Sequence, residues 1–118
     1  MTPDDFVQAL KLTCRDGAVG DCVESFTNPP GRRPRQGLVR LSQWFNALSP
    51  SDREFVVGAM REAADASLFG VLCVIDGVRA IEPVGEKSEF TLTASRAGVQ
   101  STISPSETFL HDILRSEP

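Results

Sequence analysis

The stretch from Asp65 to Glu82 is the most apolar part of the chain, and small residues recur along it at regular steps. Such spacing places small side chains in one line along a helix, where another element can approach closely. We therefore predict a buried central helix at about 65–82, with this line packed against its own chain; contact with a second chain is the alternative. The line comprises Ala63, Ala66, Gly70, Cys73, Gly77 and Ala80.

The dipeptide Asp76-Gly77 permits a second interpretation of the same stretch. Asp-Gly between apolar runs is typical of a tight β-hairpin, here with strands at 71–75 and 78–81. Residues 71–75 are apolar at every position, however, whereas a strand with one solvated face alternates. We favour the helix, which can begin at Pro50, run straight or bend near 65–70, and end before Pro83.

Helical periodicity also occurs before this stretch. Thr2-Pro3-Asp4-Asp5 is a good helix start, and Gly17 is a natural stop for that helix. A short helix over 19–26 and a proline-rich loop over 27–37 are expected next. The helical pattern returns at Leu38, and Ser49-Pro50 ends one helix and starts another, so we expect these two helices to pack as a hairpin.

The last third of the chain combines a strand pattern with a short helix. Residues 89–95 alternate strictly and can pair with 99–104 through a short glycine-containing loop, which predicts a hairpin at about 89–104. Ser104-Pro105 repeats the earlier start signal and is expected to open a C-terminal helix. The pattern therefore predicts a mainly α fold with a small antiparallel β-hairpin (α+β), as a single globular domain over 1–118.

Charge is unevenly distributed in this acidic chain. The net charge is -4 and the pI is about 4.9, which argues against nucleic-acid binding by the whole surface. Residues 32–40 nevertheless hold four arginines and no acid. Arg32, Arg33 and Arg35 lie in the proline-rich loop, where they could bind phosphate or an acidic protein surface. Weak nucleic-acid binding through this loop is one alternative function.

Cysteine usage and the apolar pattern bear on location. The three cysteines, Cys14, Cys22 and Cys73, suit a reducing compartment better than a disulfide framework. The N-terminus lacks the apolar core of a secretory signal, and the longest nearly unbroken apolar run is too short to span a bilayer. We expect a cytoplasmic protein that is not bound to a membrane.

No sequence motif of a known catalytic class is present, and His111 is the one histidine of the chain. His111 and Asp112 could supply a base or a ligand, with Asp76 and Glu82 as carboxylate partners. This is the basis of an alternative in which the protein binds a small ligand or is an enzyme. The simpler interpretation is a half-exposed histidine and solvated acids at helix ends. We expect neither a cofactor nor a metal.

Trp44 precedes Phe45 on the helix that follows the arginine loop. We expect both rings to pack in the core. A partly exposed Trp44 beside the arginine loop would instead resemble an interface anchor.

Two segments resemble a group of small uncharacterised bacterial proteins, a domain of unknown function. They are Phe-Gly-Val-Leu-Cys-Val-Ile-Asp-Gly-Val-Arg-Ala-Ile-Glu at 69–82 and Phe-Leu-His-Asp-Ile-Leu at 109–114. The resemblance implies a bacterial cytosolic domain and supplies no activity or site residues.

These observations lead to one main functional hypothesis. Small size, net acidity and the absence of catalytic motifs favour a non-enzymatic protein-interaction domain, such as an acidic immunity-type or regulatory partner. Its binding residues would be drawn from the arginine loop, Trp44, Asp76 and His111. The expected partner is another protein, and a homodimer is the second form considered.

Overall fold

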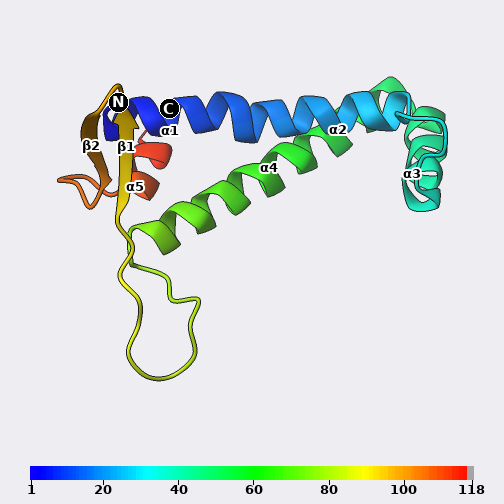
Figure 1. Cartoon of the computed structure of the whole chain (residues 1–118). Coiled ribbons are helices and arrows are strands. Elements are labelled where there is room, and N and C mark those ends of the chain that lie inside the picture. The colour runs from blue at the N-terminus through cyan, green and yellow to red at the C-terminus, as the bar shows by residue number, and fades with distance from the viewer. Residues whose placement is uncertain (117–118) are drawn as a thin grey trace.

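The computed structural model of the chain describes residues 1–116 and confirms the mainly α fold with a small antiparallel hairpin (Figure 1). One long N-terminal helix comprises α1 (Pro3–Leu10), a π-helical segment η1 (Lys11–Asp16) and α2 (Gly17–Thr27). It is followed by α3 (Gln36–Ala47), α4 (Pro50–Ile75), β1 (Leu92–Arg96), β2 (Val99–Ser104) and α5 (Leu110–Arg115).

The N-terminal helix starts as predicted and ends later than predicted. The Thr2 hydroxyl accepts a hydrogen bond from the Asp5 backbone N–H, and the Asp5 carboxylate accepts one from the Thr2 N–H. This reciprocal capping box satisfies donors that a helix start leaves free. The predicted stop at Gly17 is wrong, because Gly17 has helical angles (φ -62°, ψ -41°) and the chain continues to Thr27.

The π-helical segment keeps one side of this long helix turned inward. Val7, Lys11 and Val19 are buried, and Arg15 between them is half-buried, so inward residues recur at every fourth position. In a regular α-helix each step of four residues drifts by about 40° around the axis. The wider turn of a π-helix, with its i→i+5 bonds, offsets that drift. The segment therefore keeps residues that are four positions apart on the same side of the helix.

α4 is one helix that stops at Ile75, before the predicted limit near 82. Its start follows the sequence signal, since the Ser49 hydroxyl accepts a hydrogen bond from the Asp52 N–H. At its end Gly77 has φ +78°, and the N–H groups of Gly77 and Val78 donate to the carbonyls of Val74 and Cys73. This is a Schellman motif. Asp76-Gly77 thus ends a helix and forms no hairpin turn, and Pro83 lies well beyond the stop.

β1 and β2 form the predicted hairpin over a narrower range, 92–104. Arg96 pairs with Val99 across a two-residue turn, in which Ala97 and Gly98 have φ values of 50° and 80°. Positive φ at both positions is typical of a type I′ turn, whose twist matches that of the strands. The pairing shifts register between Leu92 and Thr93. The hairpin packs against α1 through β2.

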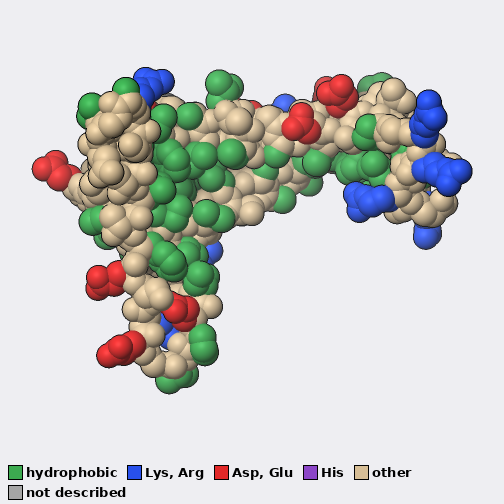
Figure 2. Space-filling view, in the orientation of Figure 1, with side chains coloured by type: hydrophobic (Ala, Val, Ile, Leu, Met, Phe, Trp, Pro, Cys, Tyr) green, Lys and Arg blue, Asp and Glu red, His purple; other side chains and the backbone are tan. Residues whose placement is uncertain are grey.

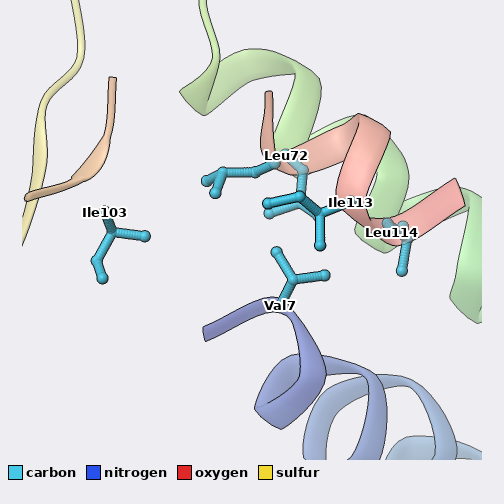
Figure 3. Close-up of a cluster of buried hydrophobic side chains, with 6 residues drawn as sticks. Val7, Leu72, Ile103, Ile113 and Leu114 are labelled. Atoms are coloured by element: carbon cyan, nitrogen blue, oxygen red, sulfur yellow. The ribbon is translucent and has the colours of Figure 1, made fainter. Parts of the chain in front are cut away.

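The main core lies where α1, α4, α5 and β2 meet, and its side chains point toward one another in Figure 3. α5 supplies half of its members and begins at Leu110, so the Ser104-Pro105 signal does not start it; that peptide bond is cis. The buried members are Val7, Leu72, Ile103, Leu110, Ile113 and Leu114.

A smaller cluster lies at the opposite end of the long helix. The rings of Phe26 and Phe45 meet edge to face at 5.9 Å, and Phe45 is buried. The Arg53 side chain donates hydrogen bonds to the carbonyls of Phe45 and Asn46 and lies over the Phe45 ring. α3 packs mainly against α2, so the expected α3–α4 helix hairpin is wrong although the connection between them is short.

The molecule is open and extended. Its radius of gyration is 18.1 Å, whereas a compact chain of this length has roughly 13–14 Å. The hairpin and α5 lie at one end and α3 at the other, joined by the long helix and α4 (Figure 1). Only Leu72 and Cys73 of α4 are buried. The central helix therefore exists, but most of it is not buried as predicted.

Candidate functional site

Asp76, directly after α4, binds the first turn of α5. Its side chain is 2% exposed, Oδ1 accepts a hydrogen bond from the Leu110 N–H at 3.0 Å, and Oδ2 accepts one from the His111 N–H at 2.9 Å. These N–H groups lack partners within their own helix, and a carboxylate also suits the positive end of the helix dipole. Asp76 is therefore buried and partnered, and it is not the solvated acid at a helix end that the simpler interpretation expected.

The imidazole of His111 completes this arrangement. Its Nδ1 lies 2.6 Å from Asp76 Oδ2, and since a carboxylate only accepts hydrogen bonds, Nδ1 carries the proton. The ring stacks on Phe109 at 5.3 Å and meets Phe69 edge to face at 5.6 Å. Nε2 lies 3.4 Å from Oδ1 of Asp112. Three of the four residues proposed for a ligand site thus lie together.

Glu82 does not join them. It lies in the 77–91 segment, where its carboxylate accepts hydrogen bonds from the Ser88 N–H at 2.6 Å and the Ser88 hydroxyl at 2.8 Å. These bonds, the backbone one foremost, lower the pKa of Glu82. The Lys87 amino group donates to the carbonyls of Glu82 and Pro83. Glu82 therefore organises its own loop.

The Asp76–His111 pair joins a carboxylate to an imidazole, and the other neighbours of the ring are Phe69, Phe109 and Asp112. An imidazole held through Nδ1 leaves Nε2 as the nitrogen that can act as a base or ligand, and here Nε2 faces the carboxylate of Asp112. Over residues 1–116, however, no group of three His, Cys, Asp or Glu side chains is placed to hold a metal ion. A hollow of about 700 Å³ lies elsewhere, between the hairpin and Met1. The geometry serves to hold α5 on α4.

An ion-pair cluster that the sequence analysis missed adjoins the pair. Arg15 lies 3.1 Å from Asp65, Arg115 also pairs with Asp65, and the Arg115 guanidinium lies 4.4 Å from the centre of the Phe69 ring. The hydrogen bond from Arg115 is the main reason that the pKa of Asp65 is lowered. Asp65, Phe69 and Asp76 lie on one side of α4 by helical spacing, a signal that was available in the sequence.

The other predicted binding residues lie at the far end of the molecule. Arg32, Arg33 and Arg35 are exposed between α2 and α3, and basic side chains gather at this end in Figure 2. Trp44 is 53% exposed, so its predicted place in the core is wrong. Its neighbour Phe45 is buried instead, because α3 turns that side toward α2. The predicted site residues therefore form two separate groups.

The outward side of α4 is a third feature, which we term the outer face; it comprises Phe55, Ala59, Ala63, Ala66 and Gly70. Phe55 is 76% exposed, and the three alanines are also exposed. Of the small-residue line, Cys73 is buried, and at Gly70 an added Cβ would meet the Arg79 guanidinium. Packing within the chain thus covers only Gly70 and Cys73, in the middle of this line, and Ala63, Ala66, Gly77 and Ala80 are exposed. The sequence analysis missed Phe55, and helical spacing gave no signal of its exposure, because it lies five full turns before the buried Cys73.

Comparisons with family models, curated proteins and solved structures found no match to this chain. Within residues 1–116, no helix combines the length and apolarity needed to cross a bilayer.

Proposed function

We propose that this protein is a non-enzymatic protein-interaction domain whose open surface is completed by a protein partner. The observation that carries the proposal is its surface area. The chain exposes 8487 Å², whereas a compact monomer of 12.8 kDa exposes about 6300 Å². The excess of about 2200 Å² is the area that a large interface would cover.

The nature of the exposed side chains supports the same proposal. Large apolar residues are exposed on three helices, among them Leu12 on the long helix, Leu41 and Trp44 on α3, and Phe55 on α4. Aromatic residues of this kind are enriched at protein interfaces and supply much of their binding energy. Single exposed apolar residues are ordinary, but several along an extended molecule favour a partner.

The narrower parts of the hypothesis also remain proposals. Two exposed free cysteines, Cys14 and Cys22, favour a reducing compartment, and we place the domain in the bacterial cytoplasm on that basis and on the resemblance of 69–82 and 109–114. Net acidity supports an immunity-type or regulatory partner of a basic protein. The exposed side chains of Arg32, Arg33 and Arg35 favour instead a protein partner with an acidic patch. Nucleic-acid binding by these arginines would show an affinity that falls steeply with salt concentration.

Site-specific photo-crosslinking in the native cell tests the proposed function. A photoreactive phenylalanine at Phe55 should form a discrete adduct with a protein, because this side chain projects from the outer face. The matched control carries the same probe at Gln8, an exposed polar position of α1. Adducts at Phe55 and none at Gln8 support an interaction domain. Absence of adducts at Phe55, Leu12 and Trp44 alike would refute it.

A further inference from the structure

The end of the molecule formed by the 28–35 loop and α3 is basic, although the chain as a whole is acidic. From Ser25 to Ser51 the chain holds four arginines and no acid, whereas all 16 acids lie outside this span with only eight of the 12 bases. The four arginines are exposed, and basic side chains gather at this end in Figure 2. They are Arg32, Arg33, Arg35 and Arg40.

None of these four guanidinium groups forms an ion pair with another residue of 1–116. By contrast, Arg15 and Arg115 both pair with Asp65. Arg35 also stands at the N-cap of α3, where a positive charge meets the positive end of the helix dipole and no acid in the first turn offsets it. The fold therefore leaves four positive charges without a counter-charge, and such local departures from stabilising patterns are expected at functional surfaces.

Three acids stand near this end and limit the extent of the basic surface. Glu24 is in the last turn of α2, where the three arginines of the loop outnumber it. Asp52 and Glu54 are near the start of α4, which follows the C-terminal end of α3. The 12 residues of α3 place that end roughly 18 Å from its start. The positive charge is therefore concentrated around the 32–35 loop and decreases toward the C-terminal end of α3.

Exposed apolar side chains lie on α3 beside the arginines. Leu41 is 47% exposed and Trp44 is 53% exposed. Successive residues of an α-helix turn by about 100°, so Arg40, Leu41 and Trp44 share a sector of roughly 100°. This sector is turned about 120° from the buried Ser42 and Phe45. We term this surface the α3 face; it comprises the four arginines with Leu41 and Trp44.

The composition of the α3 face favours a protein segment over a nucleic acid. Tryptophan and arginine are the residue types that supply much of the binding energy at protein interfaces, and Leu41 adds an aliphatic contact that a phosphate or sugar does not use. A longer nucleic acid would carry its phosphates past this face toward the acidic remainder of the chain. An extended segment of about six residues matches the length of α3 at roughly 3.3 Å per residue.

We propose that the α3 face binds a short acidic segment of another protein, in which aspartates or glutamates adjoin an apolar residue. The acidic side chains pair with the arginines of the 32–35 loop, and the apolar side chain packs on Leu41 and Trp44. Complementary charge speeds the encounter and fixes the orientation of the segment. This inference rests on the proposed function and names the chemistry of the partner.

Selection from a library of random peptides displayed on phage tests that chemistry. Peptides retained by the immobilised full chain should be enriched in aspartate and glutamate and should contain an apolar residue. A variant with Arg32→Glu, Arg33→Glu and Arg35→Glu should lose this enrichment. Arg96→Glu, at an exposed arginine of β1, is the matched control and should retain it. Circular dichroism should show that both variants are folded.

Fluorescence anisotropy of a labelled acidic peptide from this selection measures the role of single side chains. Leu41→Ala and Trp44→Ala should each raise the dissociation constant by about tenfold, because each removes part of the apolar contact. Val99→Ala, at an exposed apolar position of β2, should leave the dissociation constant unchanged. The affinity of the parent protein should fall as the salt concentration rises, because the paired charges are exposed.

Two results would overturn the inference. One is a selection in which acidic residues are not enriched, or are enriched equally by the triple arginine variant. The other is a single-stranded oligothymidylate that binds the parent protein more tightly than the selected acidic peptides do. Either result, together with photo-crosslinked protein adducts at Phe55 or Leu12, would refute the role of the α3 face and retain the interaction domain.

Discussion

The carboxylate of Asp76 and the imidazole of His111 lie 2.6 Å apart, although 35 residues separate them in the chain. Asp76 accepts hydrogen bonds from two backbone N–H groups of α5 as well as from this ring. One buried side chain at the end of α4 thus satisfies three donors of the C-terminal helix, which carries half of the main core.

Removal of the Asp76 carboxylate should therefore destabilise the whole core. Asp76→Ala leaves three donors without their partner and is expected to lower the free energy of unfolding by about 2–4 kcal/mol. Asp76→Asn retains one acceptor oxygen and should cost less. Urea denaturation measures both, with Asp112→Ala as the exposed control, expected within about 0.5 kcal/mol of the parent. Equal effects at the two positions would contradict the assigned role of Asp76.

The ion pairs of Asp65 predict a specific pH dependence. The guanidinium of Arg115 lowers the pKa of this carboxyl in the folded chain, so its stabilising effect is present above the ordinary carboxyl pKa and is lost as the pH falls through the lowered value. Asp65→Asn should cost about 1 kcal/mol at pH 7, and this difference should shrink toward zero as the pH falls below the ordinary carboxyl pKa and through the lowered value of Asp65.

Thermal unfolding of Asp65→Asn and of the parent protein across pH 2–8, with all other conditions held constant, would measure how their stability difference changes with pH. Arg115→Gln, which removes the main partner, should reproduce the same trend. A stability difference that stays constant with pH would show that Asp65 acts through packing and not through its charge.

Two leucines give a matched test of where the core lies. Leu72 is fully buried between α1 and α5, whereas Leu12 is 72% exposed on the long helix. Leu72→Ala should lower the free energy of unfolding by about 2–5 kcal/mol, because it removes apolar burial and leaves a cavity. Leu12→Ala should change it by less than about 0.5 kcal/mol in the monomer. Similar losses in denaturation of both variants would contradict this core.

Two glycines of the α4 region should respond to alanine in opposite directions. Gly77 ends the helix at φ +78°, where a Cβ is strained, so Gly77→Ala should destabilise by roughly 1 kcal/mol. Gly58 lies within the helix, and an added Cβ would meet nothing within 4 Å. Gly58→Ala should therefore stabilise by about 0.5–1 kcal/mol. Denaturation of both variants tests whether α4 ends at Gly77. A Gly77→Ala variant more stable than the parent would show that the helix ends at another residue.

The sequence predicted elements better than it predicted their contacts. Ser49-Pro50 located the start of α4 because a capping signal is local, and strict alternation located the hairpin for the same reason. Gly17 does not end the N-terminal helix, because helix propensity is weak beside tertiary packing. Pro83 does not end α4, because the turn at Gly77 ends that helix first. The join between Asp76 and His111 depends on how α5 docks on α4, which no local pattern encodes.

The π-helical segment connects two parts of the N-terminal helix that pack in different clusters. Val7 belongs to the main core, and Phe26 to the cluster at the other end, and the segment between them sets their relative rotation. Removing one residue from 11–16 would turn one half by about 100° against the other. The length of this segment, more than the identity of its side chains, therefore fixes how the two ends of the protein face each other.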